Sequence, residues 1–161
     1  MKKTLLLILT FLAFTMQFSC NNYKPVYDEV VAIGSDGWRA DNPLEFQVSV
    51  IDTSKVYDLL LHIRNTRTYD YRNLWLFIET IAPNGQSYSD TVEVILADES
   101  GRWLGKGIGN VNAMLEPYIT GVKFAYRGVY TIILTQGMRE ESLEDILDIG
   151  LRVVEHKNKK K

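Results

Sequence analysis

The sequence has little of what most catalytic and metal-binding sites require. Its 161 residues include one cysteine, Cys20, and two histidines, His62 and His156. No disulfide can form within one chain, no cysteine-based zinc site can be built, and no His-x-His or His-Glu-x-x-His spacing occurs. The Gly-x-Ser-x-Gly elbow of hydrolases is also absent. The sequence therefore predicts a protein that uses no metal and no cofactor and is not an enzyme.

The charge pattern does not favour nucleic-acid binding. The chain carries 18 basic and 20 acidic residues, and its net charge is −2. Lysines and arginines are scattered along it, apart from a basic tail at residues 156–161. A charge run at a chain end is typical of a solvated segment. We therefore expect no nucleic-acid partner.

The only long apolar run lies at the N-terminus, where two lysines precede the apolar stretch 4–14. This is the layout of a signal peptide, and Ser19 directly before Cys20 is typical of a lipoprotein cleavage site, although Gln17 stands where an aliphatic residue is usual. We predict that Cys20 becomes the first residue and carries fatty acyl chains, palmitate among them, which together hold a protein on a bilayer without a transmembrane helix. The alternatives are an uncleaved anchor and a secreted chain with a free thiol.

The sequence also indicates where the anchored chain resides and how it is divided. Residues 21–24 read Asn-Asn-Tyr-Lys, without the acidic run that directs some lipoproteins to the cell surface, so we expect the periplasmic face of the cell envelope. No second linker follows. The predicted division is a signal peptide at 1–19, a lipidated tether at 20–26, one domain at 27–155 and the basic tail.

Hydrophobic residues recur with a period of two, which is typical of half-buried β-strands. Phe46, Val48 and Val50 alternate with polar residues. The runs 74–78 and 130–134 are apolar at odd-numbered and even-numbered positions alike, which predicts central strands covered on both faces. We predict an all-β, antiparallel β-sandwich of jelly-roll-like type, with about eight strands. Its strands are expected near 27–33, 44–51, 56–64, 73–82, 88–97, 121–126, 128–136 and 148–155.

Two segments have helical features. Ser142 with an acidic residue three positions later resembles a capping box, so we predict one short helix near 142–147. The stretch 110–118 has a weaker helical pattern before Pro117.

The aromatic residues support an alternative function, in which a β-sandwich stacks exposed rings on a glycan or on peptidoglycan. Trp38 and Trp103 lie beside turns and are the candidates for exposure, whereas Trp75 lies within the most apolar strand and is expected in the core. A tryptophan that covers the end of a sandwich is the competing structural interpretation.

Another candidate site is the long polar and aromatic loop at 64–72, since loops commonly carry binding residues. We predict that it contacts partner proteins, with Trp103 as a second contact. The candidate residues are Arg64, Arg67, Tyr69, Tyr71, Arg72 and Trp103.

A hydrolase would need two carboxylates, or His62 and an acid, to converge in a cleft. The acidic residues between 140 and 148 cluster around a turn, which is typical of a solvated surface. The sequence therefore does not favour hydrolysis.

A series of short stretches stands in a recognisable order along nearly the whole mature chain. They are Cys20, Tyr27-Asp28, Trp38, Phe46-Gln47-Val48, Asp52-Thr53, Tyr57-Asp58-Leu59, 61–65, 69–78, Asp90-Thr91-Val92-Glu93, 101–107, 136–139 and 148–152. Together they resemble the gliding motility lipoprotein GldH family of Bacteroidetes.

The resemblance implies an accessory lipoprotein of the cell envelope that binds other proteins of the gliding apparatus and, through it, of the type IX secretion system. It implies no enzymatic activity, and its only functional residue that maps onto this sequence is the lipidated cysteine, at Cys20.

Overall fold

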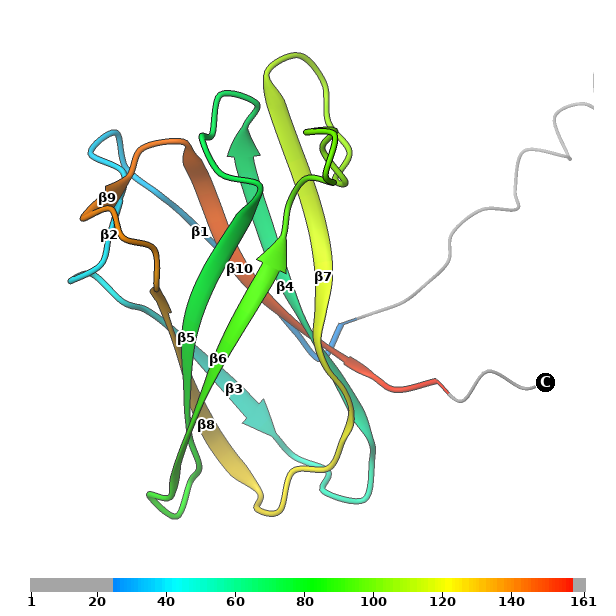
Figure 1. Ribbon diagram of the computed structural model, residues 1–161. Helices are drawn as coiled ribbons and strands as arrows, with labels where there is room; N and C mark the ends of the chain where they lie inside the picture. The colour runs from blue at the N-terminus through cyan, green and yellow to red at the C-terminus, as the bar shows by residue number, and fades with distance from the viewer. Residues whose placement is uncertain (1–24, 158–161) are drawn as a thin grey trace, which may run out of the picture.

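The computed structural model describes residues 25–157, which form two facing layers of antiparallel strands (Figure 1). The predicted lipidation site Cys20 lies outside the described residues. The strands are β1 (Tyr27–Ala32), β2 (Trp38–Arg39), β3 (Leu44–Val50), β4 (Tyr57–Thr66), β5 (Asn73–Ile81), β6 (Ser87–Ile95), β7 (Val111–Val122), β8 (Gly128–Gln136), β9 (Ser142–Leu143) and β10 (Ile146–Glu155).

Two four-stranded sheets make the layers. One, called the β4 sheet, has the strand order β1-β10-β4-β7, and the other, called the β5 sheet, has the order β3-β8-β5-β6. The short strands β2 and β9 pair with each other beside them. Every pairing is antiparallel, so the predicted all-β antiparallel class is confirmed.

The core lies between the two sheets and follows from the period-two pattern. In β3, every second residue from Leu44 to Val50 is buried, as predicted. Phe46 from the β5 sheet and Ile63 and Ile149 from the β4 sheet are fully buried in one cluster. Burying an aliphatic or aromatic side chain of this size contributes about 1.5–3 kcal/mol, so these strands are held together by their inward faces.

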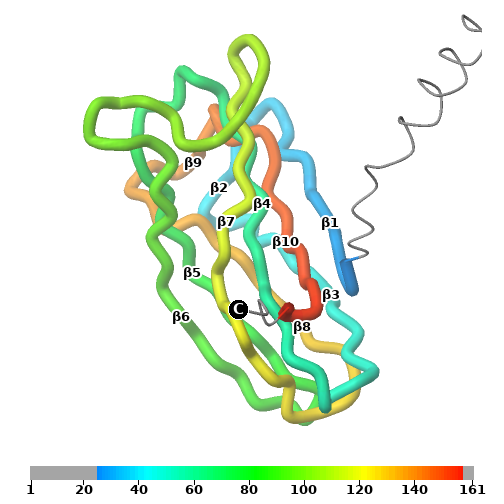
Figure 2. The backbone as a smooth tube through the Cα atoms, turned by 90° about the vertical axis from the view of Figure 1, so that its right-hand side faces the viewer, coloured from blue at the N-terminus to red at the C-terminus, as the bar shows by residue number. Residues whose placement is uncertain are grey.

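The two long sides of the sandwich differ. On one side, the edge strands β1 and β3 lie against each other. On the other side the free edges are β6 and β7, and Figure 2 shows the molecule with this side facing the viewer. Among the described residues, each of these two strands pairs with one other strand, and β7 is also bridged at Ala113 by Lys106 of the connection between β6 and β7.

The helix predicted near 142–147 is wrong, and residues 25–157 contain no helix. The segment forms β9 and the start of β10 instead. Ser142 does not cap a helix, because its hydroxyl donates to the carbonyl oxygen of Asp36 at 2.6 Å. Leu143 and Ile146 are buried in the core, so pairing with β2 and packing against the sheets outweigh the local capping pattern.

The helical interpretation of 110–118 and the strand expected at 121–126 are also wrong. One long strand, β7, takes in residues 111–122, and residues 123–127 form the connection from β7 to β8. Pro117 is compatible with this strand because β7 is an edge, where a missing amide hydrogen costs no ladder bond on the free side.

The fold decides between the alternatives for Trp38 and contradicts the prediction for Trp75. Trp38, a candidate for exposure, is fully buried, in agreement with the structural alternative, and its indole N–H donates to the carbonyl oxygen of Asn42 at 3.1 Å. Trp75, expected in the core, keeps 38% of its surface exposed. The reason is that β5 is central within its sheet but is covered on one face only, so its odd-numbered residues point outward.

Candidate functional site

The outer face of the β5 sheet carries a group of apolar side chains that no other described element covers. Trp75 and Phe77 project from β5 and are 38% and 51% exposed. Half-buried Tyr71, Ile133 and Met138 lie in the loop before β5, in β8 and after β8. We call these five residues the β5 face.

Local contacts fix the two exposed rings. The amide of Trp75 lies 3.3 Å from the sulfur of Met138, and the carbonyl oxygen of Trp75 accepts a bond from the amide of Gly137 at 2.7 Å. A Cβ at Gly137 would lie 3.0 Å from the ring of Phe77, so the glycine leaves the space in which that ring sits. The rings are therefore held by the backbone that follows β8.

Two shallow hollows run along this face. One, of about 640 Å³, is lined by Tyr71, Trp75 and Phe77, and the next, of about 500 Å³, shares Phe77 and Thr91 with it. Polar pairs border the first hollow. The amide of Asn73 donates to Glu93 at 2.5 Å, and the hydroxyl of Tyr71 donates to Glu140 at 2.8 Å, which raises the pKa of Tyr71. The surface thus combines exposed rings with anchored polar groups.

The predicted contact loop is only partly available for contact. Arg67 and Arg72 are exposed, and Tyr71 belongs to the β5 face. Tyr69 is buried, its ring meets that of Tyr71 edge-on at 5.6 Å between centroids, and burial raises its pKa. Its role in the structure is to hold the loop on the core, since its ring is not at the surface.

Arg64 lies outside the loop, on the outer face of β4, where it forms an ion pair with Asp148 at 2.6 Å. The second oxygen of the same carboxylate lies 2.9 Å from Nε2 of His62. The histidine and an acid thus converge, as a hydrolase would need, but none of the hollows described in residues 25–157 is lined by either residue. Among those residues, no group of three side chains is placed to bind a metal ion.

Trp103 is half-buried and packs against the core, in the connection between β6 and β7. That connection folds around Asp98, whose carboxylate accepts bonds from the amides of Ser100 and Arg102 at 2.9 and 3.0 Å. Together with the Ser100 hydroxyl, these donors lower the pKa of Asp98 to about 2. Trp103 is therefore held within an ordered loop and presents only part of its ring.

Sequence reasoning missed Trp75 and Phe77 as surface residues. The signal was present in the neighbouring strand, because Glu93 and Thr91 stand opposite them in the register of β6. Residues directly opposite each other in an antiparallel pair share a face, so polar partners indicate a solvent-facing side. Only the pairing of β5 with β6 makes this signal usable.

Comparison with known proteins gives a consistent result. The chain matches the family model described as GldH lipoprotein over residues 25–153. It is 36% identical over 158 residues to a gliding motility lipoprotein GldH homolog of Christiangramia forsetii, covering 94% of this chain and 96% of that protein. It is 33% identical over 149 residues to the gliding motility lipoprotein GldH of Flavobacterium johnsoniae, covering 88% of this chain and 91% of that protein. Within residues 25–157, no helix has the length and hydrophobicity needed to cross a bilayer.

Proposed function

The chain belongs to the GldH lipoprotein family, and we propose that it is a lipid-anchored accessory protein of the cell envelope that works by binding other proteins. Its relatives are named gliding motility lipoproteins. The proposal extends this to partners in the gliding apparatus and, through it, in the type IX secretion system. It assigns no catalytic step to the chain.

The β5 face is the observation that carries the proposal. Aromatic side chains that stay in water forgo the free energy of burial, about 25 cal/mol per Å² of apolar surface. Contiguous exposed apolar surface with a polar rim is typical of a binding site. Tryptophan and tyrosine are also enriched among the residues that dominate protein interfaces. Trp75 and Tyr71, with Phe77 between the two hollows, fit this pattern.

The anchor would place this surface in a favourable position. Tyr27 at the start of β1 pairs with Val153 near the end of β10, so both ends of the described chain leave the same end of the β4 sheet. Asn65, next to the loop at 67–72, pairs with Ile146 at the other end. A lipid on Cys20 would thus hold the tethered end at the bilayer, on its periplasmic face, and direct the loop away from it. Tethering raises the effective concentration toward other anchored proteins, so a weak interface suffices.

We further propose that the exposed part of the loop extends the β5 face as a contact surface. Arg67 and Arg72 would border it, and Trp103 would form a second, smaller contact. Arginine is enriched at interface hot spots because its planar group binds carboxylates and stacks on rings.

A glycan-binding function remains the second candidate, and it is supported by the same surface rather than by Trp38. Exposed Trp75 and Phe77 lie beside the polar groups of Asn73, Glu93 and Glu140. Saccharide faces stack on such rings while their hydroxyl groups bind carboxylates. Quenching of the Trp75 fluorescence by peptidoglycan fragments, lost in Trp75→Phe, would favour this candidate over protein binding.

The proposal is tested by crosslinking in intact envelopes of the native host, followed by affinity purification of the tagged protein. We compare the wild type with Trp75→Ser and Phe77→Ser, and use Ile108→Ser as the matched control, because Ile108 is a 94% exposed apolar residue in a loop. Wild type and Ile108→Ser should recover the same specific envelope proteins, and the two β5-face variants should lose them while remaining folded.

The anchor is tested in the same experiment with Cys20→Ala. We expect this variant to lose the specific partners, because it is no longer confined to the membrane. Recovery of an unchanged set by Cys20→Ala would contradict the role of the anchor. Recovery of no envelope protein by the wild type would contradict binding altogether.

A further inference from the structure

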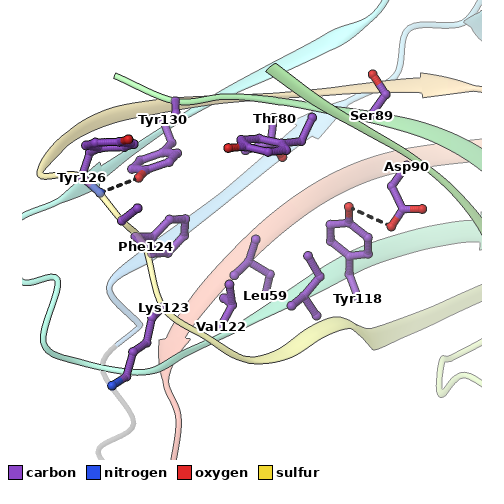
Figure 3. Close-up of a pocket in the computed structure, with 14 residues that line it drawn as sticks. Leu59, Thr80, Ser89, Asp90, Tyr118, Val122, Lys123, Phe124, Tyr126 and Tyr130 are labelled. Carbon is purple, nitrogen blue, oxygen red and sulfur yellow. Dashed lines mark hydrogen bonds between the residues drawn. The ribbon is translucent and has the colours of Figure 1, made fainter. Parts of the chain in front are cut away.

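A cavity of about 390 Å³ opens between the free edges of β6 and β7 (Figure 3). It lies between the two sheets and is largely apolar, which is typical of a preformed ligand pocket. Five aromatic rings contribute to its lining: Tyr88, Tyr118, Phe124, Tyr126 and Tyr130.

The cavity is held open by contacts at both ends. At one end, the hydroxyl of Tyr118 in β7 donates to Asp90 in β6 at 3.4 Å, bridging the two sheets. At the other end, the rings of Phe124 and Tyr130 pack at 4.7 Å between centroids, and the Tyr130 hydroxyl accepts a bond from the amide of Tyr126. Burial and the nearby Asp90 raise the pKa of Tyr118 to about 12. The space is thus framed by fixed groups.

The strand β6 beside this cavity has a regular, unpaired edge. It pairs with β5 over nine consecutive residues without a bulge. Just before β6, the amide of Ala82 donates a hydrogen bond to the carbonyl oxygen of Gln86, and just after β6, the amide of Leu96 donates one to the carbonyl oxygen of Arg72. At both ends of the hairpin, the bonded residue on the β6 side is therefore even-numbered. Because hydrogen-bonded and non-bonded pairs alternate along an antiparallel ladder, the backbone groups of Ser87 and Ser89 point to the free edge.

Thr91 supports this assignment. Its amide donates to the Oδ1 atom of Asp90 in the side chain at 2.8 Å, as expected for an amide that does not bond to β5. No lysine or proline occurs in β6 to block the edge.

The opposite edge, β7, is protected. Pro117 has no amide hydrogen, and the register with β4 shifts between Tyr57 and Leu60. Gly121 has φ +72°, which interrupts the regular strand conformation. A strand that adds to this side of the sandwich would therefore pair with β6.

The mouth of the cavity is acidic. The charged residues of β6 and β7 that do not point to the outer face are carboxylates, Asp90 and Glu116, whereas Glu93 stands opposite Trp75 on the outer face. Asp90 lines the cavity, and Glu116 stands opposite Leu61, an inward-facing core residue. Lys123 follows β7, and Figure 3 shows its ammonium group pointing away from the rings. The surface is complementary to a basic side chain.

We propose that the free edge of β6 binds an extended peptide as an added strand, with a large apolar side chain of the peptide in the aromatic cavity. Side chains that point to the same face of a strand are two positions apart, and Tyr88 and Asp90 have this spacing in β6. The peptide therefore carries a lysine or arginine two positions from the apolar residue, directed at Asp90. Backbone bonds to Ser87 and Ser89 supply affinity, and the cavity supplies specificity.

None of the five residues of the β5 face lines this cavity, although Ser89 and Asp90 line both the cavity and the second hollow on the outer face. The proposed site uses the inner face and edge of β6, whereas Trp75 and Phe77 lie on the outer face of the sheet. The inference therefore goes beyond the proposed function and does not depend on it.

The test uses the mature chain, residues 20–161, with Cys20→Ser to keep it free of lipid. Random dodecapeptides displayed on phage are selected on this protein, and enriched peptides are synthesised with a fluorescent label for anisotropy titration. Enriched sequences should share a large apolar residue two positions from a lysine or arginine. Hydrogen exchange should slow at the amides of Ser87 and Ser89 when the peptide binds.

Variants then separate the parts of the site. Ser89→Pro removes the edge donor without removing a bond to β5, and Tyr88→Ala opens the cavity wall, so each should weaken binding at least about tenfold. Asp90→Asn keeps the acceptor for the Thr91 amide and should weaken the affinity for basic peptides by about threefold or more. Ile108→Ser, which changes an exposed apolar residue in the connection between β6 and β7, should bind like the parent protein.

Several results would overturn the proposal. It would be overturned if no peptide is enriched, if the enriched peptides lack the paired apolar and basic residues, or if Ser89→Pro binds peptides as tightly as the parent protein. Peptide binding that leaves the β6 amides unprotected would also overturn it, because the cavity would then hold a ligand without strand addition. If Ser89→Pro does not fold, Tyr88→Ala and the exchange measurement decide.

Discussion

The imidazole Nε2 of His62 in β4 lies 2.9 Å from Oδ1 of Asp148 in β10. The other oxygen of this carboxylate pairs with Arg64, so one acid joins two residues of the neighbouring strand. Asp148 is 4% exposed, whereas His62 and Arg64 reach the solvent. The arrangement stabilises the outer surface of the β4 sheet, because a nearly buried carboxylate needs both partners.

Replacing this carboxylate should destabilise the fold. In Asp148→Asn, the side chain loses the negative charge that pairs with Arg64 and keeps one acceptor oxygen in place of two. We expect a loss of about 1–3 kcal/mol in the free energy of unfolding, measured by urea denaturation. Asp41→Asn is the control, since its ion pair with Arg39 is exposed and screened by solvent and should contribute little to stability. Equal effects of the two substitutions would contradict this account.

Gly150 should be intolerant of a side chain. It stands opposite Val30 in the register of β10 with β1, and a Cβ there would lie 2.5 Å from the carbonyl oxygen of Glu29. Gly150→Ala should displace β1 and cost about 1–3 kcal/mol of unfolding free energy. Gly34→Ala is the matched control, because a Cβ at Gly34 meets nothing within 4 Å. Calorimetry should show a clear fall of Tm for Gly150→Ala alone.

Two buried asparagines should behave as a unit. The amide nitrogen of Asn112 in β7 donates to the side-chain oxygen of Asn65 in β4 at 3.2 Å, and both residues are buried. Asn65→Leu should cost about 1–3 kcal/mol, because it leaves a buried polar group without its partner. The double variant Asn65→Leu/Asn112→Leu should cost less than the sum of the single variants. Strict additivity in a double-mutant cycle would show that the pair is not coupled.

The stability of the fold should fall at alkaline pH, in part through Tyr118. Its pKa is raised from 10.0 to about 12 by burial and by Asp90. A group with a raised folded-state pKa contributes its full stability below the unfolded value and loses it as the pH rises toward the folded value. The urea midpoint of the wild type should therefore fall more steeply between about pH 10 and 12 than that of Tyr118→Phe. Parallel curves would contradict the assignment.

Local patterns predicted the strands whose two faces differ most. The alternation at Phe46, Val48 and Val50 located β3 because a strand buried on one side leaves a period-two signature in its own residues. The capping pattern at Ser142 failed because its hydroxyl bonds to Asp36, a residue far away along the chain. A local signal cannot register such a partner.

The candidate site was predicted less well than the fold. Tyr71 lines the first hollow and Tyr69 is buried, whereas Trp75, expected in the core, is partly exposed. Trp38 and Trp75 are flanked by apolar or turn residues, so their sequence contexts do not reveal which face of a strand is covered. Burial of an aromatic residue depends on the layer packed against it, which is formed by distant segments.

The sequence by itself determined the all-β class, most of the strands and the family, because these reside in short-range periodicity and in the order of residues along the chain. The tertiary structure alone decided that the outer side of β5 stays uncovered and that a cavity opens between β6 and β7. Both depend on which edges pair, and that is settled by the packing of whole sheets, with Trp38 buried and Trp75 exposed as the result.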